Sequence, residues 1–96
     1  MNSEQSHIIE ADENIFAALG FPPEEANVLQ MRAELMNNLR LTIEQKHWTQ
    51  AVAAKHLGIS QSRVSDLVRG KWDKFSLEML ITLASRCGQR VKLAAA

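Results

Sequence analysis

Apolar residues recur every three or four positions between residues 24 and 46, and this spacing predicts one long amphipathic helix. Pro23, Glu24 and Glu25 mark its start, because proline is favoured at the first helical position and acidic side chains stabilise the first turn. The apolar positions are Val28, Met31, Leu35, Leu39 and Ile43, widened by Leu29, Ala33 and Met36.

Three shorter helices are predicted further along the chain, over residues 50–57, 61–69 and 77–86. Each follows a Ser or Thr that can accept a hydrogen bond from the first helical turn, and each is followed within two residues by a glycine suited to a helix end. The caps are Thr49, Ser60 and Ser76, and the glycines are Gly58, Gly70 and Gly88. Trp48 precedes the first cap, where an apolar side chain can pack onto the next turn near Ala53.

Shorter elements are predicted on either side of this helical region. Residues 15–21 (IFAALGF) are expected to form a helical turn whose Phe16, Leu19 and Phe21 pack back on the domain. Residues 89–93 (QRVKL) alternate polar and apolar side chains, which is typical of a strand. A lone strand is unstable, so this one would have to pair with the same strand of a second subunit.

A chain of 96 residues suits one domain with a small core, whose stability a partner subunit would raise. We therefore expect an all-α domain of five helices over residues 15–96, with residues 71–75 (KWDKF) as a loop. Residues 1–14 lack a sustained periodicity, and we expect a mobile acidic segment there. No run approaches the roughly 18 apolar residues that span a membrane, the N-terminus does not resemble a secretory signal, and Cys87 is the single cysteine, so we expect a cytoplasmic protein.

The predicted helix 61–69 has one distinctly polar side. At about 100° per residue, Val64, Leu67 and Val68 fall together and face the core. The opposite side carries Ser62, Ser65, Asp66 and Arg69, flanked near its N-terminal end by Gln61 and Arg63. Hydrogen-bonding groups beside positive charge suit the floor of the DNA major groove, where Gln can pair with adenine, Arg with guanine and Ser with either. Helix 50–57 would then lie across the DNA backbone.

The charge is zero in total but unevenly distributed. Residues 1–39 contain seven acidic residues and one basic residue, whereas residues 40–75 contain seven basic and three acidic ones. A balanced total can thus conceal one acidic and one basic face, each with its own partner. Because the basic part contains the polar helix, the distribution is compatible with DNA binding.

Residues 50–69 resemble the helix-turn-helix of the phage-repressor and Cro-like (XRE) family. That pattern requires a small residue at its fifth position, glycine at the ninth, and apolar residues at the fourth, eighth, tenth, fifteenth and eighteenth. Counted from Gln50, all of these match: Ala54, Gly58, and then Ala53, Leu57, Ile59, Val64 and Leu67. The resemblance implies a lambda-repressor-like fold in which Gln50 touches a phosphate and braces Gln61, while Gln61 and Ser62 read bases.

A narrower resemblance covers residues 15–93 and points to the short single-domain antitoxins of the HigA type. It rests on LGF before the long helix and on the run TQ…AA…LGISQSRVSDLVRGKWDKFSLEML. The resemblance implies a homodimer that represses its own operon and neutralises a ribonuclease toxin of the RelE/HigB superfamily. Two recognition helices related by a two-fold axis would bind an inverted-repeat operator.

The residues expected to contact DNA lie in or beside the two helices. They are Gln50, Ser60, Gln61, Ser62, Arg63, Ser65, Arg69 and Lys71. Arg63 can read a base, grip a phosphate or pair with Asp66, and Lys71 can meet a phosphate or only keep the chain soluble. Asp66 can hold Arg63 or Arg69 in one rotamer, which we favour, or accept a hydrogen bond from cytosine.

Other candidate chemistry is sparse. His47 and His56 have no third ligand at metal-binding spacing, so we expect neither a metal nor a cofactor. Cys87 is expected to be a small core residue, and Trp48 and Trp72 to anchor loops. The chain has no Gly-rich phosphate loop, no paired acids in an apolar setting and no nucleophile elbow, so we expect no enzymatic activity.

The sequence therefore predicts a sequence-specific DNA-binding repressor that acts as a dimer and has an antitoxin role. One alternative is a stand-alone prophage or host regulator; another is a protein-only toxin-binding module that has lost DNA binding, which Asp66 and the neutral total charge would favour. The acidic N-terminal third is either solvated or a surface for a basic toxin, with apolar anchors at Ile8, Ile9, Ile15 and Phe16.

Overall fold

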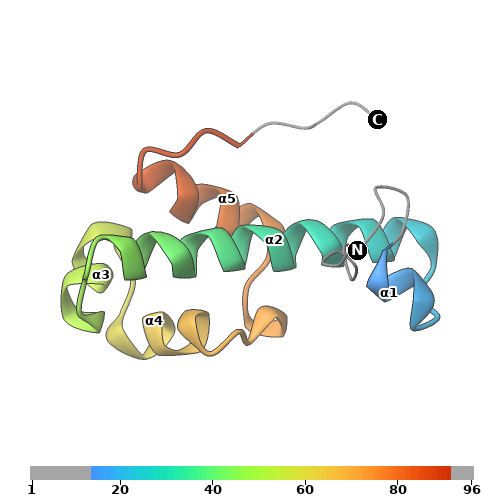
Figure 1. Cartoon of the computed structure of the whole chain (residues 1–96), viewed down its shortest axis with the longest axis horizontal. Coiled ribbons are helices and arrows are strands. Elements are labelled where there is room, and N and C mark those ends of the chain that lie inside the picture. The colour runs from blue at the N-terminus through green and yellow to red at the C-terminus, as the bar shows by residue number, and fades with distance from the viewer. Residues whose placement is uncertain (1–13, 92–96) are drawn as a thin grey trace, which may run out of the picture. The chain divides into compact units, whose positions relative to one another are not determined.

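The computed structural model describes residues 14–91, and over that range the chain is all α-helical, as predicted (Figure 1). Five α-helices and one short 3₁₀ helix follow one another in the described range: α1 (Ile15–Ala18), α2 (Pro23–Gln45), α3 (Gln50–Leu57), α4 (Gln61–Val68), η2 (Trp72–Lys74) and α5 (Leu77–Arg86). The long helix begins at Pro23 with Glu24 and Glu25 in its first turn, which confirms the predicted start. The described residues belong to two compact units, and the boundary along the chain lies between Met31 and Arg32.

The first unit contains α1 and the beginning of α2. Asn14 caps α1: its side-chain oxygen accepts hydrogen bonds from the backbone N–H groups of Phe16 (2.8 Å) and Ala17 (3.4 Å), while its amide donates to the Ala26 carbonyl (2.9 Å). Asn14 is therefore held in place, contrary to the expectation that the mobile segment extends to residue 14; residues 1–13 lie outside the described range. The Phe16 and Phe21 rings meet edge to face at 6.1 Å, but Leu19 is 70% exposed, so its predicted packing is wrong.

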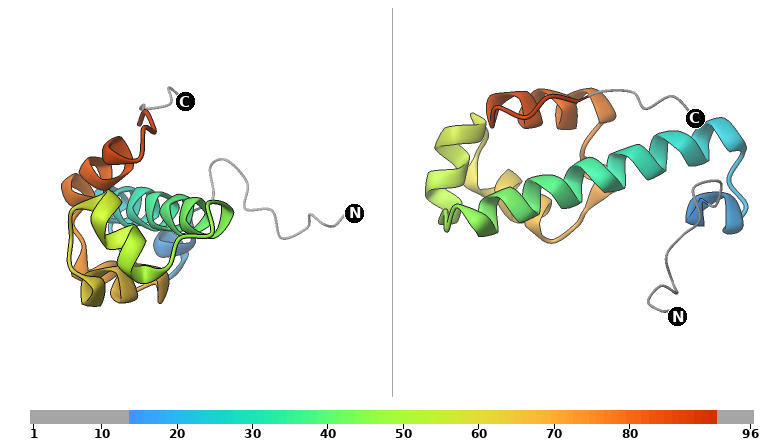
Figure 2. Two further views of the ribbon diagram at one scale, coloured as in Figure 1. Left: turned by 90° about the vertical axis from the view of Figure 1, so that its left-hand side faces the viewer. Right: turned by 45° about the horizontal axis from the view of Figure 1, so that its top comes forward.

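The second unit, from Arg32 onward, contains the core. In this unit the later part of α2 has α5 on one side and α3 and α4 on the other (Figures 1 and 2). The apolar positions predicted for α2 are confirmed at Leu35, Met36, Leu39 and Ile43, all of which are buried, whereas Val28 near the start of the helix is 39% exposed, so its predicted burial is wrong. The other helices and the segment before α5 complete the core with Ala53, Ala54, Leu57, Val64, Leu67, Phe75, Leu80, Leu83 and Ala84.

The turn that follows α2 contains a residue with an unusual backbone conformation. His47 has a φ of 56°, in the left-handed region that glycine normally occupies. The turn is closed by two backbone hydrogen bonds, from the N–H of His47 to the Glu44 carbonyl (3.1 Å) and from that of Trp48 to the Ile43 carbonyl (3.1 Å). This pattern, in which the sixth residue bonds back to the first, is the Schellman helix ending. The chain thus leaves α2 sharply and enters α3 after a few residues.

Two sequence predictions near the C-terminus need correction. The segment 71–75 was expected to be a loop, but its centre forms η2, because the Phe75 N–H bonds back to the Trp72 carbonyl (3.3 Å). Residues 89–91 of the expected strand are not in a strand, and residues 92 and 93 lie outside the described range. The side-chain amide of Gln89 instead donates to the Thr42 hydroxyl (2.6 Å) on α2, and Val91 packs against the core.

Candidate DNA-binding site

The helices α3 and α4 and the turn between them form the predicted helix-turn-helix. Thr49 caps α3 by accepting a hydrogen bond from the Val52 N–H (3.1 Å), and Ser60 caps α4 by accepting one from the Arg63 N–H (3.2 Å). Between the two helices lie residues 58–60. Three buried residues of α3 and two of α4 join the helices across this turn: Ala53, Ala54, Leu57, Val64 and Leu67.

The turn itself is rigidly held. Gly58 has a φ of 72°, and the N–H groups of Gly58 and Ile59 both donate to the Ala54 carbonyl, at 2.8 and 3.1 Å. A long-range contact reinforces this ending, because Arg86 Nη1 on α5 donates to the Leu57 carbonyl at 2.7 Å. A carbonyl at the end of a helix has no partner within that helix, so Arg86 supplies one. The angle between α3 and α4 is therefore fixed by local turn geometry and by α5.

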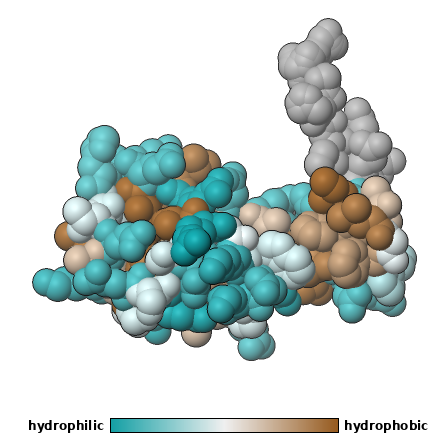
Figure 3. All heavy atoms as spheres, turned by 90° about the horizontal axis from the view of Figure 1, so that it is seen from below, coloured by the Kyte–Doolittle hydropathy of each residue, from teal (hydrophilic) through white to brown (hydrophobic). Residues whose placement is uncertain are grey.

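The two sides of α4 divide as the sequence predicts. Val64 and Leu67 are completely buried and Val68 packs against the core, whereas Gln61, Ser62 and Arg69 are exposed. Ser65 and Asp66 are intermediate in exposure. In Figure 3, which views the molecule from the α4 side, hydrophilic side chains dominate over this helix. The exposed face of α4 is thus a row of small or flexible hydrogen-bonding groups.

Ser60 has a structural role in addition to any DNA contact. Its hydroxyl caps α4 and lies 3.3 Å from the Ser62 hydroxyl, so these two predicted DNA-binding residues form one hydrogen-bonded pair. Gln50 and Gln61 are the exposed first residues of α3 and α4. Within residues 14–91 no hydrogen bond joins their side chains, so the bracing implied by the family resemblance is not seen. Contact of all four residues with DNA stays a prediction.

The charged residues of α4 pair differently from the favoured prediction. Asp66 forms an ion pair with Lys71 (3.8 Å) rather than with Arg63 or Arg69. The Arg63 guanidinium lies instead over the Phe75 ring, with its central carbon 4.4 Å from the ring centroid. The hypothesis that Asp66 holds an arginine rotamer is therefore wrong: the chain reverses at Gly70 and brings Lys71 back to the end of α4, where it reaches the carboxylate.

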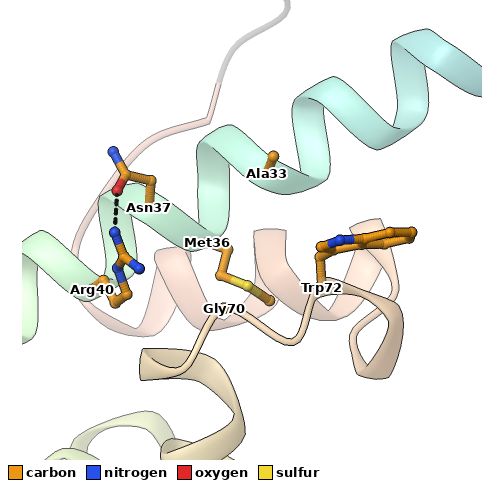
Figure 4. Close-up of a pocket in the computed structure, with 6 residues that line it drawn as sticks. All are labelled: Ala33, Met36, Asn37, Arg40, Gly70 and Trp72. Carbon is orange, nitrogen blue, oxygen red and sulfur yellow. Dashed lines mark hydrogen bonds between the residues drawn. The ribbon is translucent and has the colours of Figure 1, made fainter. Parts of the chain in front are cut away.

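A second positive charge lies near the end of α4. Arg40 on α2 forms no ion pair with an acidic side chain among the described residues. Its guanidinium donates a hydrogen bond to the side-chain oxygen of Asn37 at 2.9 Å (Figure 4). These two residues border an open hollow of about 220 Å³, whose other lining residues are Ala33, Met36, Gly70 and Trp72. A Cβ atom added at Gly70 would lie 4.0 Å from Arg40 Nη1. The folded chain thus places Arg40 close to the turn that carries Lys71, a proximity that sequence spacing does not reveal.

His56 and Cys87 pack against neighbouring side chains. His56 stacks on Trp48 with ring centroids 4.1 Å apart, and Lys46 lies 5.9 Å from the Trp48 ring, so Trp48 anchors the α2–α3 turn as predicted. Burial raises the pKa of the Cys87 thiol, and the nearby Lys46 charge offsets part of this shift.

Among the residues that the structure describes, no three His, Cys, Asp or Glu side chains are grouped so that they could hold a metal ion. No described helix is long and apolar enough to cross a membrane.

Several important residues were missed by sequence reasoning. Arg86 and Phe75 were not singled out, although each touches the helix-turn-helix directly. The contact of Arg86 with Leu57 spans 29 positions, and no local pattern signals such a pair. A basic residue in the last turn of α5 and an aromatic residue before the Ser76 cap are the weak signals that were available.

Two helices joined by a short rigid turn, the second with a buried apolar side and an exposed polar side, define a helix-turn-helix DNA-binding protein. The chain belongs to the helix-turn-helix domain family, whose model matches residues 15–96. It is also similar to a solved structure named "Putative XRE Family Transcriptional Regulator", with 35% sequence identity and a TM-score of 0.69 over 75% of this chain and 81% of that one. A search of curated proteins finds no match. The protein is a DNA-binding transcriptional regulator with an XRE-type helix-turn-helix.

Proposed function

We propose that this protein is a sequence-specific repressor that binds an inverted-repeat operator as a two-fold dimer. The observation that carries the proposal is the exposed polar face of α4, on a helix whose orientation is fixed by the Gly58 turn and by Arg86. Gln61, Ser62 and Arg69 on that face can pair with base edges in the major groove. In a dimer, the two α4 helices would enter successive major grooves about 34 Å apart.

We propose further that the protein is the antitoxin of a toxin–antitoxin pair. The support comes from the first unit, which has exposed apolar side chains at Ile15 (51%), Leu19 (70%), Phe21 (37%) and Val28 (39%). Figure 3 shows hydrophobic atoms gathered over α1 and the start of α2. Contiguous exposed apolar side chains are typical of a protein interaction surface.

The charge of this surface favours a basic partner. Residues 14–31 carry two charged side chains, Glu24 and Glu25, both acidic and both exposed in the first turn of α2. Acidic side chains around an apolar surface match a partner with basic side chains around its own apolar contacts. A ribonuclease of the RelE/HigB type needs cations to hold RNA, so an acidic antitoxin surface could cover them. Under this proposal the protein acts in the cytoplasm, by binding and without catalysis.

The DNA proposal is tested by fluorescence anisotropy with the full chain, the DNA upstream of its own gene, and a scrambled duplex of equal length. Titrations at about 50 and 200 mM salt are expected to show tight binding to the upstream DNA, with a loss of about 10³–10⁵ in affinity between the two conditions for 6–10 phosphate contacts. Equal and weak binding to both duplexes would contradict autoregulation and favour the protein-only alternative.

The antitoxin proposal requires a separate measurement. The product of a neighbouring reading frame of about a hundred codons, the size expected of such a toxin, would be mixed with the protein and analysed by size exclusion. We expect a complex that is weakened by Leu19→Asp and left intact by Gln61→Ala, because Leu19 lies on the first unit and Gln61 on the DNA-binding face. Absence of any complex, together with normal operator binding, would identify a stand-alone regulator.

A further inference from the structure

The guanidinium group of Arg63 is held by an aromatic ring. Arg63 is the third residue of α4, and its central guanidinium carbon lies 4.4 Å from the centroid of the Phe75 ring. Phe75 is only 2% exposed, so the ring is fixed within the core between η2 and α5. A cation on a fixed ring face is attracted by the π electrons and loses freedom to move.

This arrangement leaves the hydrogen-bond donors of Arg63 available. The ring contacts the guanidinium through its π electrons and takes up none of its N–H groups, which stay free for other acceptors. The carboxylate that could have drawn them inward, Asp66, is paired with Lys71 at 3.8 Å. Within the described part of the chain, the Arg63 side chain has no hydrogen-bonded or ion-paired partner. Its positive charge is therefore both oriented and unneutralised.

The position of Arg63 on α4 decides which part of DNA it can meet. At about 100° per residue, Arg63 lies at the side of the helix, whereas Ser62 and Arg69 lie at the centre of the exposed face. When a helix occupies the major groove, its central face lies nearest the base edges, and a side chain on its flank reaches a base or a phosphate according to the direction in which it is held. Phe75 holds Arg63 on the side that adjoins the η2 segment. The sequence left open whether Arg63 reads a base or grips a phosphate, and the geometry favours the phosphate.

We propose that Phe75 is a positioning residue that fixes Arg63 as a clamp for one DNA phosphate beside the recognition helix. The inference rests on DNA binding by α3 and α4, and it assigns Arg63 to affinity rather than to base selection. Phe75 does not touch DNA and acts through Arg63. Because Arg63 is already oriented before binding, it loses little side-chain entropy when the phosphate arrives.

The charge effect is tested with Arg63→Met on the upstream and scrambled duplexes over a range of salt concentrations. We expect affinity to fall on both duplexes by a similar factor, and the slope of log K against log salt to become shallower by about 0.9, the value for one phosphate contact. Arg32→Met is the matched control, since Arg32 is another arginine near an aromatic ring (6.0 Å from that of Trp72) but lies on α2; its slope should stay at the wild-type value. Loss of affinity on the upstream duplex alone would show that Arg63 reads a base and would overturn the proposal.

The role of Phe75 is tested with a double-mutant cycle. Phe75→Leu keeps an apolar side chain in the core but removes the ring, and we expect about 2- to 5-fold weaker binding to both duplexes with the salt slope retained. In the Arg63→Met background the same substitution should cause no further loss. An equal loss in both backgrounds would show that Phe75 acts only through the fold.

A measurement on the unmodified protein guards against variants that fail to fold. The aromatic ring should shift the NMR signals of the Arg63 side-chain protons upfield of the exposed arginines, with Arg90 as the reference. Unshifted Arg63 signals would show that the ring does not hold the side chain in solution and would overturn the positioning role. A wild-type protein that binds no DNA would overturn both this inference and the proposed repressor function, whereas normal binding with an unchanged slope in Arg63→Met would overturn this inference alone.

Discussion

Arg86 on α5 donates a hydrogen bond from Nη1 to the backbone carbonyl of Leu57, at 2.7 Å, and so caps the last turn of α3. The two residues are 29 positions apart, and the bond links the last helix to the turn that aims the recognition helix. A cation near the carbonyl end of a helix is also favoured by the helix dipole. The helix-turn-helix is therefore braced from outside its own sequence.

Removal of this brace should destabilise the protein. For Arg86→Met we expect a loss of about 1 kcal/mol in the free energy of unfolding, because the Leu57 carbonyl loses a charged donor but can still reach water. Urea unfolding followed by circular dichroism measures the change. Arg90→Met is the control, since Arg90 is an exposed arginine without a hydrogen bond to the described residues. An equal effect of both substitutions would assign the loss to charge alone.

Gly58→Ala should be more harmful than the same change at Gly88. Both residues have a positive φ, 72° and 80°, which costs an alanine about 1–2 kcal/mol. A Cβ atom at Gly58 would also lie 3.0 Å from Arg86 Nη1, whereas one at Gly88 would meet nothing within 4 Å. The difference between the two melting temperatures measures the crowding of Arg86, and identical temperatures would show that Arg86 moves aside freely.

His47→Gly should stabilise the protein. His47 adopts a φ of 56° at the end of α2, and glycine at such a position avoids the strain of a side chain in the left-handed region. After subtraction of the greater freedom of glycine in the unfolded chain, we expect a gain of about 0.5–1 kcal/mol. The same replacement at His56, in the last turn of α3, should lower stability, because glycine has a low helix propensity and the stack on Trp48 is lost. A melting temperature that falls in both variants would contradict the strain at His47.

Gln61→Ala and Arg69→Ala should weaken binding to the operator by about 1–3 kcal/mol each, the range for a bidentate base contact. Both side chains are exposed, so the free energy of unfolding should stay nearly unchanged. Anisotropy titrations on the upstream and scrambled duplexes separate base recognition from general affinity. Gln45→Ala, which removes an exposed glutamine from the end of α2, is the matched control. Wild-type affinity in both recognition-helix variants would favour the protein-only alternative.

Alkaline conditions should reveal the burial of Cys87. Burial raises the pKa of this thiol in the folded state, so the unfolded chain ionises first as pH rises. The free energy of unfolding that this shift contributes is fully present below the thiol pKa of the unfolded chain and is lost as pH rises through the higher folded-state pKa. The free energy of unfolding, measured from pH 7 to 10, should therefore fall more steeply with pH for the wild type than for Cys87→Ser. Parallel curves would show that the thiol is not desolvated.

Much of the helix-turn-helix was predictable because its signals are local. Thr49, Ser60 and Ser76 accept the expected capping hydrogen bonds, and the helices that follow them begin at the predicted residues. The apolar spacing in α4 places Val64 and Leu67 in the core and leaves Gln61 and Ser62 exposed, as expected. The residues of the candidate DNA-binding face could thus be named before the fold was known.

The pairing of charges was not predictable in the same way. Spacing along a helix favoured a pair of Asp66 with Arg63 or Arg69, but the reversal at Gly70 brings Lys71 to Asp66 and the fold brings Phe75 to Arg63. Likewise, the expected strand at residues 89–93 rested on an alternating pattern, whereas Gln89 is bound to Thr42, 47 positions earlier. Each error comes from a partner that lies elsewhere in the chain.

The sequence by itself determined where α3, α4 and α5 begin and which side of α4 faces the core, because capping and helical periodicity depend on neighbours within a few positions. Only the tertiary structure decided which side chains hold the recognition helix and orient its charges, through Arg86 on Leu57 and Phe75 under Arg63. The physical reason is that these contacts join separate elements, so they depend on how the helices pack around the core and not on local conformation.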